Sequence, residues 1–156
     1  MAYALWAMQK LEGSSLPPVA FSEWRKWRVR ERASDQFDVP REFGILGLYV
    51  LGTWDGSPGS GPADKRHLAP DVVYIGMSDH VLRRLERTHA AVQRYRVDFN
   101  DPLCSRLHFA QWESAWTNFG PRKGRVVQAA VLRALEAHLI AEYAMNFGRL
   151  PALNRQ

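Results

Sequence analysis

The pattern of apolar and polar positions predicts a small sheet. An unbroken apolar run over residues 45–51 is short enough to be a buried strand. A second run over 72–75 ends at Gly76, and residues 107–112 alternate between apolar and polar in the manner of a third strand. Three strands are stable only when helices cover a face of the sheet, so the pattern predicts an α+β fold.

Helices are predicted on either side of these strands. A basic helix runs from about residue 23 to residue 33, and a second helix after Gly76 carries Leu82, Leu85, His89 and Val92 on one stripe. The last helix spans 126–145, contains no glycine or proline, and is ended by Gly148.

The domain plan follows from these elements. Residues 1–42 are predicted to be an N-terminal helical extension, and residues 43–156 a three-stranded domain with a long, Gly- and Pro-rich loop over 52–71. The length of 156 residues suits one domain with a short appendage.

The composition of the chain bears on membrane association and on the cellular compartment. The longest uncharged stretch is too short and too rich in glycine to span a membrane, so we expect no membrane association. The N-terminus lacks a basic region ahead of an apolar run, and the single cysteine, Cys104, fits a reducing compartment. These features predict a cytoplasmic protein.

The charge balance points to a polyanionic partner. Of the 21 basic residues only four are lysine, and the formal net charge is +5. Arginine matches phosphate oxygens in a bidentate manner and stacks on bases, which favours nucleic acid, although a GC-rich coding bias gives the same composition.

The basic helix over 23–33 is a candidate contact with nucleic acid. Its basic side chains could follow the DNA backbone without reading sequence, or its tryptophans, Trp24 and Trp27, could pack on the domain and leave the charges solvated. The candidate DNA-binding residues are Arg25, Lys26, Arg28 and Arg30 here, with Arg83 and Arg87 after the second predicted strand.

Two tripeptides on the first two strands carry a family resemblance. Gly47-Leu48-Tyr49 and Tyr74-Ile75-Gly76 resemble the paired motifs of the GIY-YIG nucleases. Arg84 stands eight positions after Gly76, the interval of that family's essential arginine. The helix around Glu136 resembles the family's metal-binding helix, and Asn154 resembles its closing asparagine.

The resemblance implies a division of catalytic work. Tyr49 would be the general base, Tyr74 would orient water and relay protons, and Arg84 would neutralise charge on the phosphate. Glu136 would hold one divalent cation, Mg²⁺ or Mn²⁺. Gly47, Gly76 and Asn154 would support this arrangement structurally.

Each assignment competes with a plainer interpretation. The two tyrosines are in apolar strands, where core packing is the commoner role. Arg84 has basic neighbours on both sides, so only the interval selects it. Glu136 competes with Glu142 on the same helix, and Asn154 could simply tie the tail to that helix.

The sequence also departs from the family pattern. Thr88 occupies the position where the family has a histidine or tyrosine that hydrogen-bonds the first tyrosine. We expect His89, the next residue, to reach the site from the apolar stripe, and a buried core histidine is the alternative. The loop over 52–71 and the interval from Glu136 to Asn154 are also longer than in relatives.

The resulting expectation is a metal-dependent endonuclease that cuts DNA, double-stranded rather than single-stranded, as a monomer or as a homodimer on its substrate. The alternatives are a binding module that kept the scaffold without turnover, and a nuclease for RNA or single strands.

Overall fold

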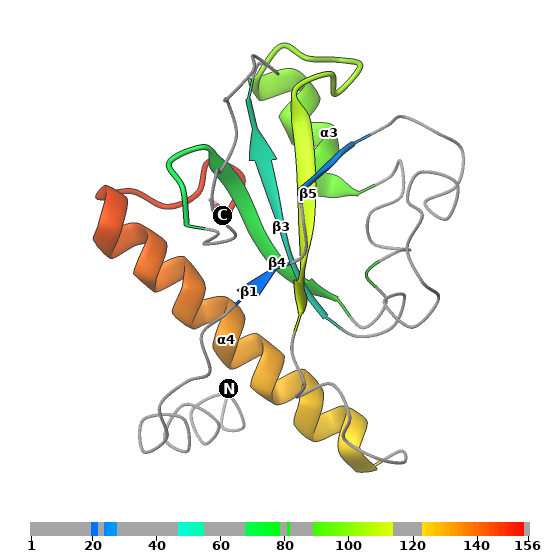
Figure 1. The fold of residues 1–156 in the computed structure, drawn as a ribbon, viewed down its shortest axis with the longest axis vertical. Helices are drawn as coiled ribbons and strands as arrows, with labels where there is room; N and C mark the ends of the chain where they lie inside the picture. Colours follow the sequence, from blue (N-terminus) through cyan, green and yellow to red (C-terminus); the bar gives the residue numbers. More distant parts are fainter. Residues whose placement is uncertain are drawn as a thin grey trace.

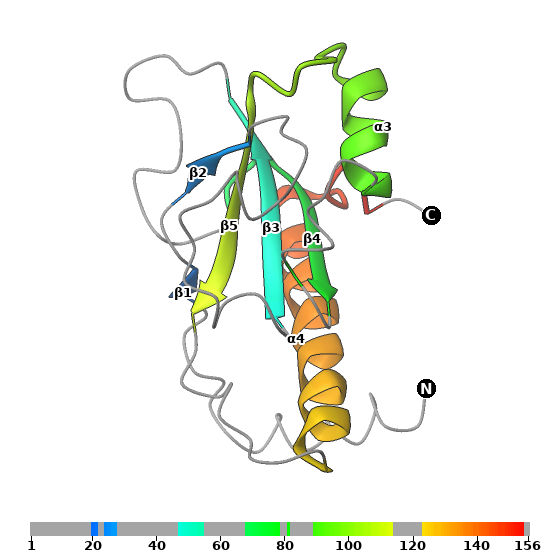
Figure 2. The same ribbon diagram turned by 90° about the vertical axis from the view of Figure 1, so that its right-hand side faces the viewer.

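The computed structural model describes residues 20–21, 24–27, 47–54, 68–78, 81, 89–113 and 123–154. Seven elements lie in these ranges (Figures 1 and 2). They are β1 (Ala20–Phe21), β2 (Arg25–Lys26), β3 (Gly47–Thr53), β4 (Val72–Ser78), α3 (Ala90–Asp98), β5 (Leu107–Glu113) and α4 (Lys123–Phe147).

The three predicted strands are confirmed and form the centre of an antiparallel sheet. The strand order is β1-β5-β3-β4, with β2 also paired to β5. Tyr49 on β3 lies opposite Gly76 on β4 and opposite Gln111 on β5. The middle strand therefore carries the first tripeptide, and the register sets the last residue of the second tripeptide, Gly76, opposite the last residue of the first, Tyr49.

Alternate residues of the sheet build two cores, one on each face. Leu48 and Val50 pack with Leu135 and Leu139 of α4. Tyr49 and Leu51 pack on the other face with side chains from α3, including Val92 and Tyr95. Figure 1 shows α4 and α3 on opposite sides of the strands. The predicted last helix is confirmed, and Gly148, with φ of 65°, ends it.

The predicted basic helix over 23–33 is wrong for residues 25 and 26, which form strand β2. Arg25 pairs with Phe109 and Lys26 with His108 on β5. A spacing of three would put Trp24 and Trp27 on one side of a helix, but in an extended chain it puts them on opposite faces. Trp24 packs against the α4-side core and Trp27 enters the α3-side core.

Pairing with β5 explains why local helix propensity fails here. The outer edge of β5 offers unpaired N–H and C=O groups, and β1 and β2 satisfy them. The tryptophans do pack on the domain, as one of the two interpretations expects. The segment from residue 28 to residue 33, with Arg28 and Arg30, lies outside the described residues.

The helix predicted after Gly76 also needs correction. His89 does not continue a helical stripe; its ψ of 122° is extended, and it is the N-cap of α3. Its Nδ1 accepts a hydrogen bond from the Ala91 N–H at 2.9 Å. That bond satisfies an N–H that the first turn of α3 leaves open, so the chain starts a new helix at this point.

The free edge of β4 is covered by side chains and by the C-terminal tail. The Asn154 side chain accepts from the Ile75 N–H at 2.8 Å and donates to the Ile75 carbonyl at 2.7 Å. The Leu153 N–H donates to the Val73 carbonyl at 2.8 Å. Asn154 therefore ties the tail to strand β4, whereas the plainer of its two interpretations was a tie to the last helix.

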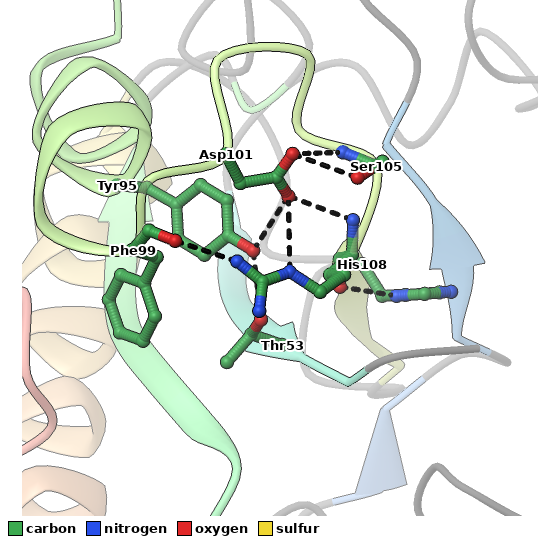
Figure 3. A network of polar contacts seen from close by, with 7 residues as sticks. Thr53, Tyr95, Phe99, Asp101, Ser105 and His108 are labelled. Atoms are coloured by element: carbon green, nitrogen blue, oxygen red, sulfur yellow. Dashed lines mark hydrogen bonds and ion pairs between the residues drawn. The ribbon is translucent and has the colours of Figure 1, made fainter. Parts of the chain in front are cut away.

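A buried polar network holds the other end of α3 to β3 (Figure 3). The Tyr95 hydroxyl lies 2.8 Å from the Thr53 hydroxyl and donates to Asp101 at 3.1 Å. Asp101 also accepts hydrogen bonds from Ser105 N, Ser105 Oγ and Arg106 N. Burial raises the pKa of Tyr95 to about 12, so this phenol stays protonated and acts as a donor.

Asp101 should make the stability of the fold depend on acid pH. Burial raises its pKa, but the hydrogen bonds from Arg106, Ser105 and Tyr95 outweigh burial and lower the pKa below its usual value. The ionised form is therefore favoured in the folded state, and its stabilisation is present above about pH 4 and lost as the pH falls through the folded pKa.

Urea unfolding of Asp101→Asn at several pH values tests this prediction. We expect the variant to be about 2 kcal/mol less stable at pH 7, since buried donors lose an acceptor. The difference should shrink below about pH 4, where the wild-type carboxyl is also neutralised. A difference that is the same at pH 3 and pH 7 would show that the charge of Asp101 contributes nothing.

Candidate active site

Three aromatic rings from three segments meet on the α3 side of the sheet. The ring centroids of Tyr49 and Tyr74 are 5.8 Å apart, and the His89 ring is 5.7 Å from Tyr49 and 5.5 Å from Tyr74. Tyr49 and His89 are buried, whereas Tyr74 is partly exposed. The two tyrosines singled out in the sequence are therefore neighbours, and the expected contact with His89 is present.

The two motif glycines make room for polar side chains beside Tyr49. A methyl group on Gly76 would clash with the Tyr74 ring and would lie 2.9 Å from the Tyr74 hydroxyl. The Tyr74 phenol thus lies over Gly76, the residue opposite Tyr49. A methyl group on Gly47 would lie 3.2 Å from Nε2 of Gln111. Any larger residue at position 76 would displace the Tyr74 ring.

The hydrogen bonds of His89 fix its tautomer. Since Nδ1 accepts from the Ala91 N–H, a neutral imidazole must carry its proton on Nε2. Nε2 lies 2.5 Å from the Tyr49 hydroxyl oxygen, so His89 donates and Tyr49 accepts. A hydrogen bond donated to a phenolic oxygen stabilises the phenolate more than the phenol. This bond therefore acts in favour of the form of Tyr49 that can take a proton.

His89→Asn separates this donation from the capping role. Asparagine caps helices well, so we expect α3 and the thermal midpoint to be largely kept. Its side chain is too short to reach the Tyr49 oxygen, and the cleavage activity proposed below should fall about 100-fold. Thermal unfolding and a cleavage time course on the same sample measure the two roles. A large loss of stability with unchanged cleavage per folded molecule would show that His89 is only structural.

Glu136 is positioned at the edge of β4 rather than on the exposed side of α4. Its Oε1 accepts a hydrogen bond from the Met77 N–H at 3.1 Å, one residue beyond Gly76. The neighbouring Leu135 and Leu139 are buried, as their apolar character predicts. Glu142 is the competing carboxylate, and its Oε2 lies 3.9 Å from Nε2 of His138 on the same helix. Glu136 is therefore the carboxylate that α4 presents to the strand carrying Tyr74.

The Glu136 carboxylate is the kind of oxygen ligand that a hard cation such as Mg²⁺ prefers. Within the described residues, no three His, Cys, Asp or Glu side chains come together as a metal cluster. One carboxylate, with waters and a substrate phosphate, is a coordination shell that Mg²⁺ accepts. A carboxylate has about four acceptor positions, more than the bond from Met77 uses.

Several predicted residues cannot be placed. Arg84, Arg83 and Arg87 lie outside the described residues, as does Thr88.

Arg25 and Lys26 are exposed on β2. By register Arg25 shares the face of Phe109 and Lys26 the face of His108, so the two charges point to opposite sides of the sheet.

Sequence reasoning missed two buried polar residues at this site, Ser78 and Gln111. Ser78 lies opposite Gly47 and Gln111 opposite Tyr49. Both are 6% exposed. The signal was present in β5, where Leu107, Phe109 and Gln111 share one face and only the last is polar. It was weak because both faces of this strand are covered.

Comparisons with known proteins add no relative. No model of a protein family matches the chain, and neither does any curated protein or solved structure. In the part of the chain that the structure describes, none of the helices combines the length and the apolar character that crossing a bilayer requires.

Proposed function

We propose that this protein is a metal-dependent endonuclease that hydrolyses phosphodiester bonds in DNA. The observation that carries the proposal is the bond from His89 Nε2–H to the Tyr49 oxygen at 2.5 Å, with the Tyr74 ring packed against both. A buried phenol held as an acceptor suits proton removal from water. Its place within paired tripeptides that resemble the GIY-YIG motifs connects that chemistry to a phosphodiester.

Tyr49 would act as the general base. As a phenolate it takes a proton from a water molecule, and the water oxygen then forms a bond to phosphorus while the bond to the leaving sugar oxygen breaks. His89 keeps the Tyr49 oxygen oriented throughout, because its own ring is fixed by the Ala91 N–H. Tyr74, partly exposed and next to Tyr49, would orient the water.

The remaining roles concern charge. Glu136 would hold Mg²⁺ or Mn²⁺, which supplies charge neutralisation for the phosphate oxygens when bound. Arg84 would contribute a permanent positive charge, and this role stays a prediction because Arg84 is outside the described residues. Arg25, exposed on β2 and on the same face of the sheet as Tyr49, would contact the DNA backbone, whereas Lys26 points to the other face.

A non-catalytic binding module is the rival function. The sequence feature that favours this function is Thr88, which replaces the expected hydrogen-bond partner of Tyr49. His89, the residue after Thr88, makes that hydrogen bond to Tyr49 instead. Thr88 is therefore no longer a reason to prefer a non-catalytic binding module.

Incubation of the purified chain with supercoiled plasmid and Mn²⁺, with and without a chelator, separates the two functions. We expect nicked or linear plasmid that is absent when the chelator is added. Retarded but intact plasmid in the presence of Mn²⁺ would favour the binding module. Matched duplex, single-stranded DNA and RNA oligonucleotides then test the preference for duplex DNA.

A further inference from the structure

Gln111 is a polar side chain that the proposed chemistry does not yet use. It lies on β5 opposite Tyr49 and is 6% exposed. The preceding residues on its face, Leu107 and Phe109, are apolar and fully buried among core side chains. Gln111 is therefore the position at which this face changes from apolar core to a polar side chain, directly beside Tyr49.

The Gln111 amide extends toward Gly47, the first residue of the first tripeptide. Its Nε2 is 3.2 Å from where a methyl group on Gly47 would be, so it occupies the space that this glycine leaves. Gly47 lies opposite Ser78, the other buried polar residue of this end of the sheet. Tyr49 on the middle strand is thus flanked by Tyr74 on the β4 side and by Gln111 on the β5 side.

The chemistry of an amide suits a phosphate in this position. Gln111 offers two N–H donors and a carbonyl acceptor, and it carries no charge that would compete with the ionisation of Tyr49. A phosphodiester has two non-bridging oxygens, so one that binds next to Tyr49 can present one oxygen to the β4 side and the other to the β5 side. A donor on the β5 side can therefore reach an oxygen that groups on the β4 side do not reach.

We propose that Gln111 contacts the substrate and donates its Nε2–H to a non-bridging oxygen of the DNA phosphate bound next to Tyr49. This assignment rests on the proposed function, because it takes the phosphate site from it. It adds a binding residue on a strand that carries neither tripeptide.

DNA affinity without turnover tests the proposal. Fluorescence anisotropy with a labelled DNA duplex, in the presence of chelator, compares wild type with Gln111→Glu and Gln93→Glu. Both variants change the net charge equally, but Gln93 is exposed on α3. We expect Gln111→Glu to weaken binding at least about tenfold, because a carboxylate would face the phosphate, and Gln93→Glu to change it less than about twofold.

Gln111→Met is a second variant that keeps the proposal testable if Gln111→Glu fails to fold. Methionine has similar length and no charge, so it should keep the thermal midpoint near that of wild type and still weaken binding about tenfold through the lost hydrogen bond. Wild-type affinity in folded Gln111→Met, or equal affinities of the two glutamate variants, would overturn the proposal. Binding without cleavage by wild type would instead overturn only the nuclease function, and no binding by wild type would overturn both.

Discussion

Tyr49→Phe should lower the rate of DNA cleavage by about 10³-fold while the protein stays folded and still binds DNA. The hydroxyl removed by this change accepts from His89 at 2.5 Å and is the proposed base. The ring stays, so the α3-side core around it keeps its packing. Loss of one buried hydrogen bond should cost only about 1 kcal/mol of folding free energy. Single-turnover cleavage of a labelled duplex at saturating enzyme measures the effect.

Tyr95→Phe is the matched control for this prediction. Tyr95 is also buried, lies on the same side of the sheet, and uses its hydroxyl in hydrogen bonds to Thr53 and Asp101. Its phenol donates to a carboxylate, whereas that of Tyr49 accepts from an imidazole, so only Tyr49 is prepared to take a proton. We expect Tyr95→Phe to lose similar stability and to cleave at nearly the wild-type rate. Equal cleavage rates for the two variants would remove Tyr49 from the mechanism.

Glu136→Gln should abolish metal-dependent cleavage, with a loss of about 10³-fold or more. A glutamine carbonyl can still accept the Met77 N–H that Glu136 Oε1 accepts now, so the edge of β4 should stay intact. The negative charge that we propose to hold a divalent cation is lost. Cleavage rates measured across a series of Mn²⁺ concentrations report this directly, because the variant should fail to reach the wild-type rate at any of them.

Glu142→Gln provides the control on the same helix. This change removes the same charge, but Glu142 lies beside His138 rather than at β4. We expect the Mn²⁺ dependence of cleavage to be unchanged. A Glu142 variant as inactive as the Glu136 variant would mean that general charge on α4, and not a metal seat at Glu136, supports the reaction.

The strands at the centre of the fold were predictable because the pattern of apolar residues and the glycine-rich segments that end it indicate the same boundaries. The apolar run before the Gly-rich loop, the run that ends at Gly76 and the alternating segment over 107–112 each became a strand. The last helix was predictable for the same reason, since its apolar stripe is long and Gly148 ends it. Burial of Leu135 and Leu139 also placed Glu136 on the inner side of that helix.

Two features depended on contacts that lie far apart in the sequence. Residues 25 and 26 form a strand because the edge of β5, more than 80 positions later, needs partners. His89 leaves the helical stripe because Nδ1 caps the next helix and Nε2 meets Tyr49, 40 positions earlier. Local helix propensity reflects neither contact, so the two predicted helices were wrong at residues 25–26 and at His89.

The candidate site was predictable in part. The tripeptides and the register of β3 and β4 bring Tyr49 and Tyr74 together, as adjacent strands must. Gln111 could not be selected, because its importance comes from the space above Gly47, which only the packed sheet defines.

The double variant Tyr49→Phe/Glu136→Gln tests most directly whether the phenol and the carboxylate serve one active centre. Residues that act as a unit show strongly non-additive losses, so the double variant should cut DNA no more slowly than the slower single variant. Single-turnover rates of the three proteins and wild type, on one duplex with Mn²⁺, provide the comparison. Residual cleavage equal to that of the slower single variant is the predicted result, and a double variant slowed by the product of the two single losses would contradict a shared centre.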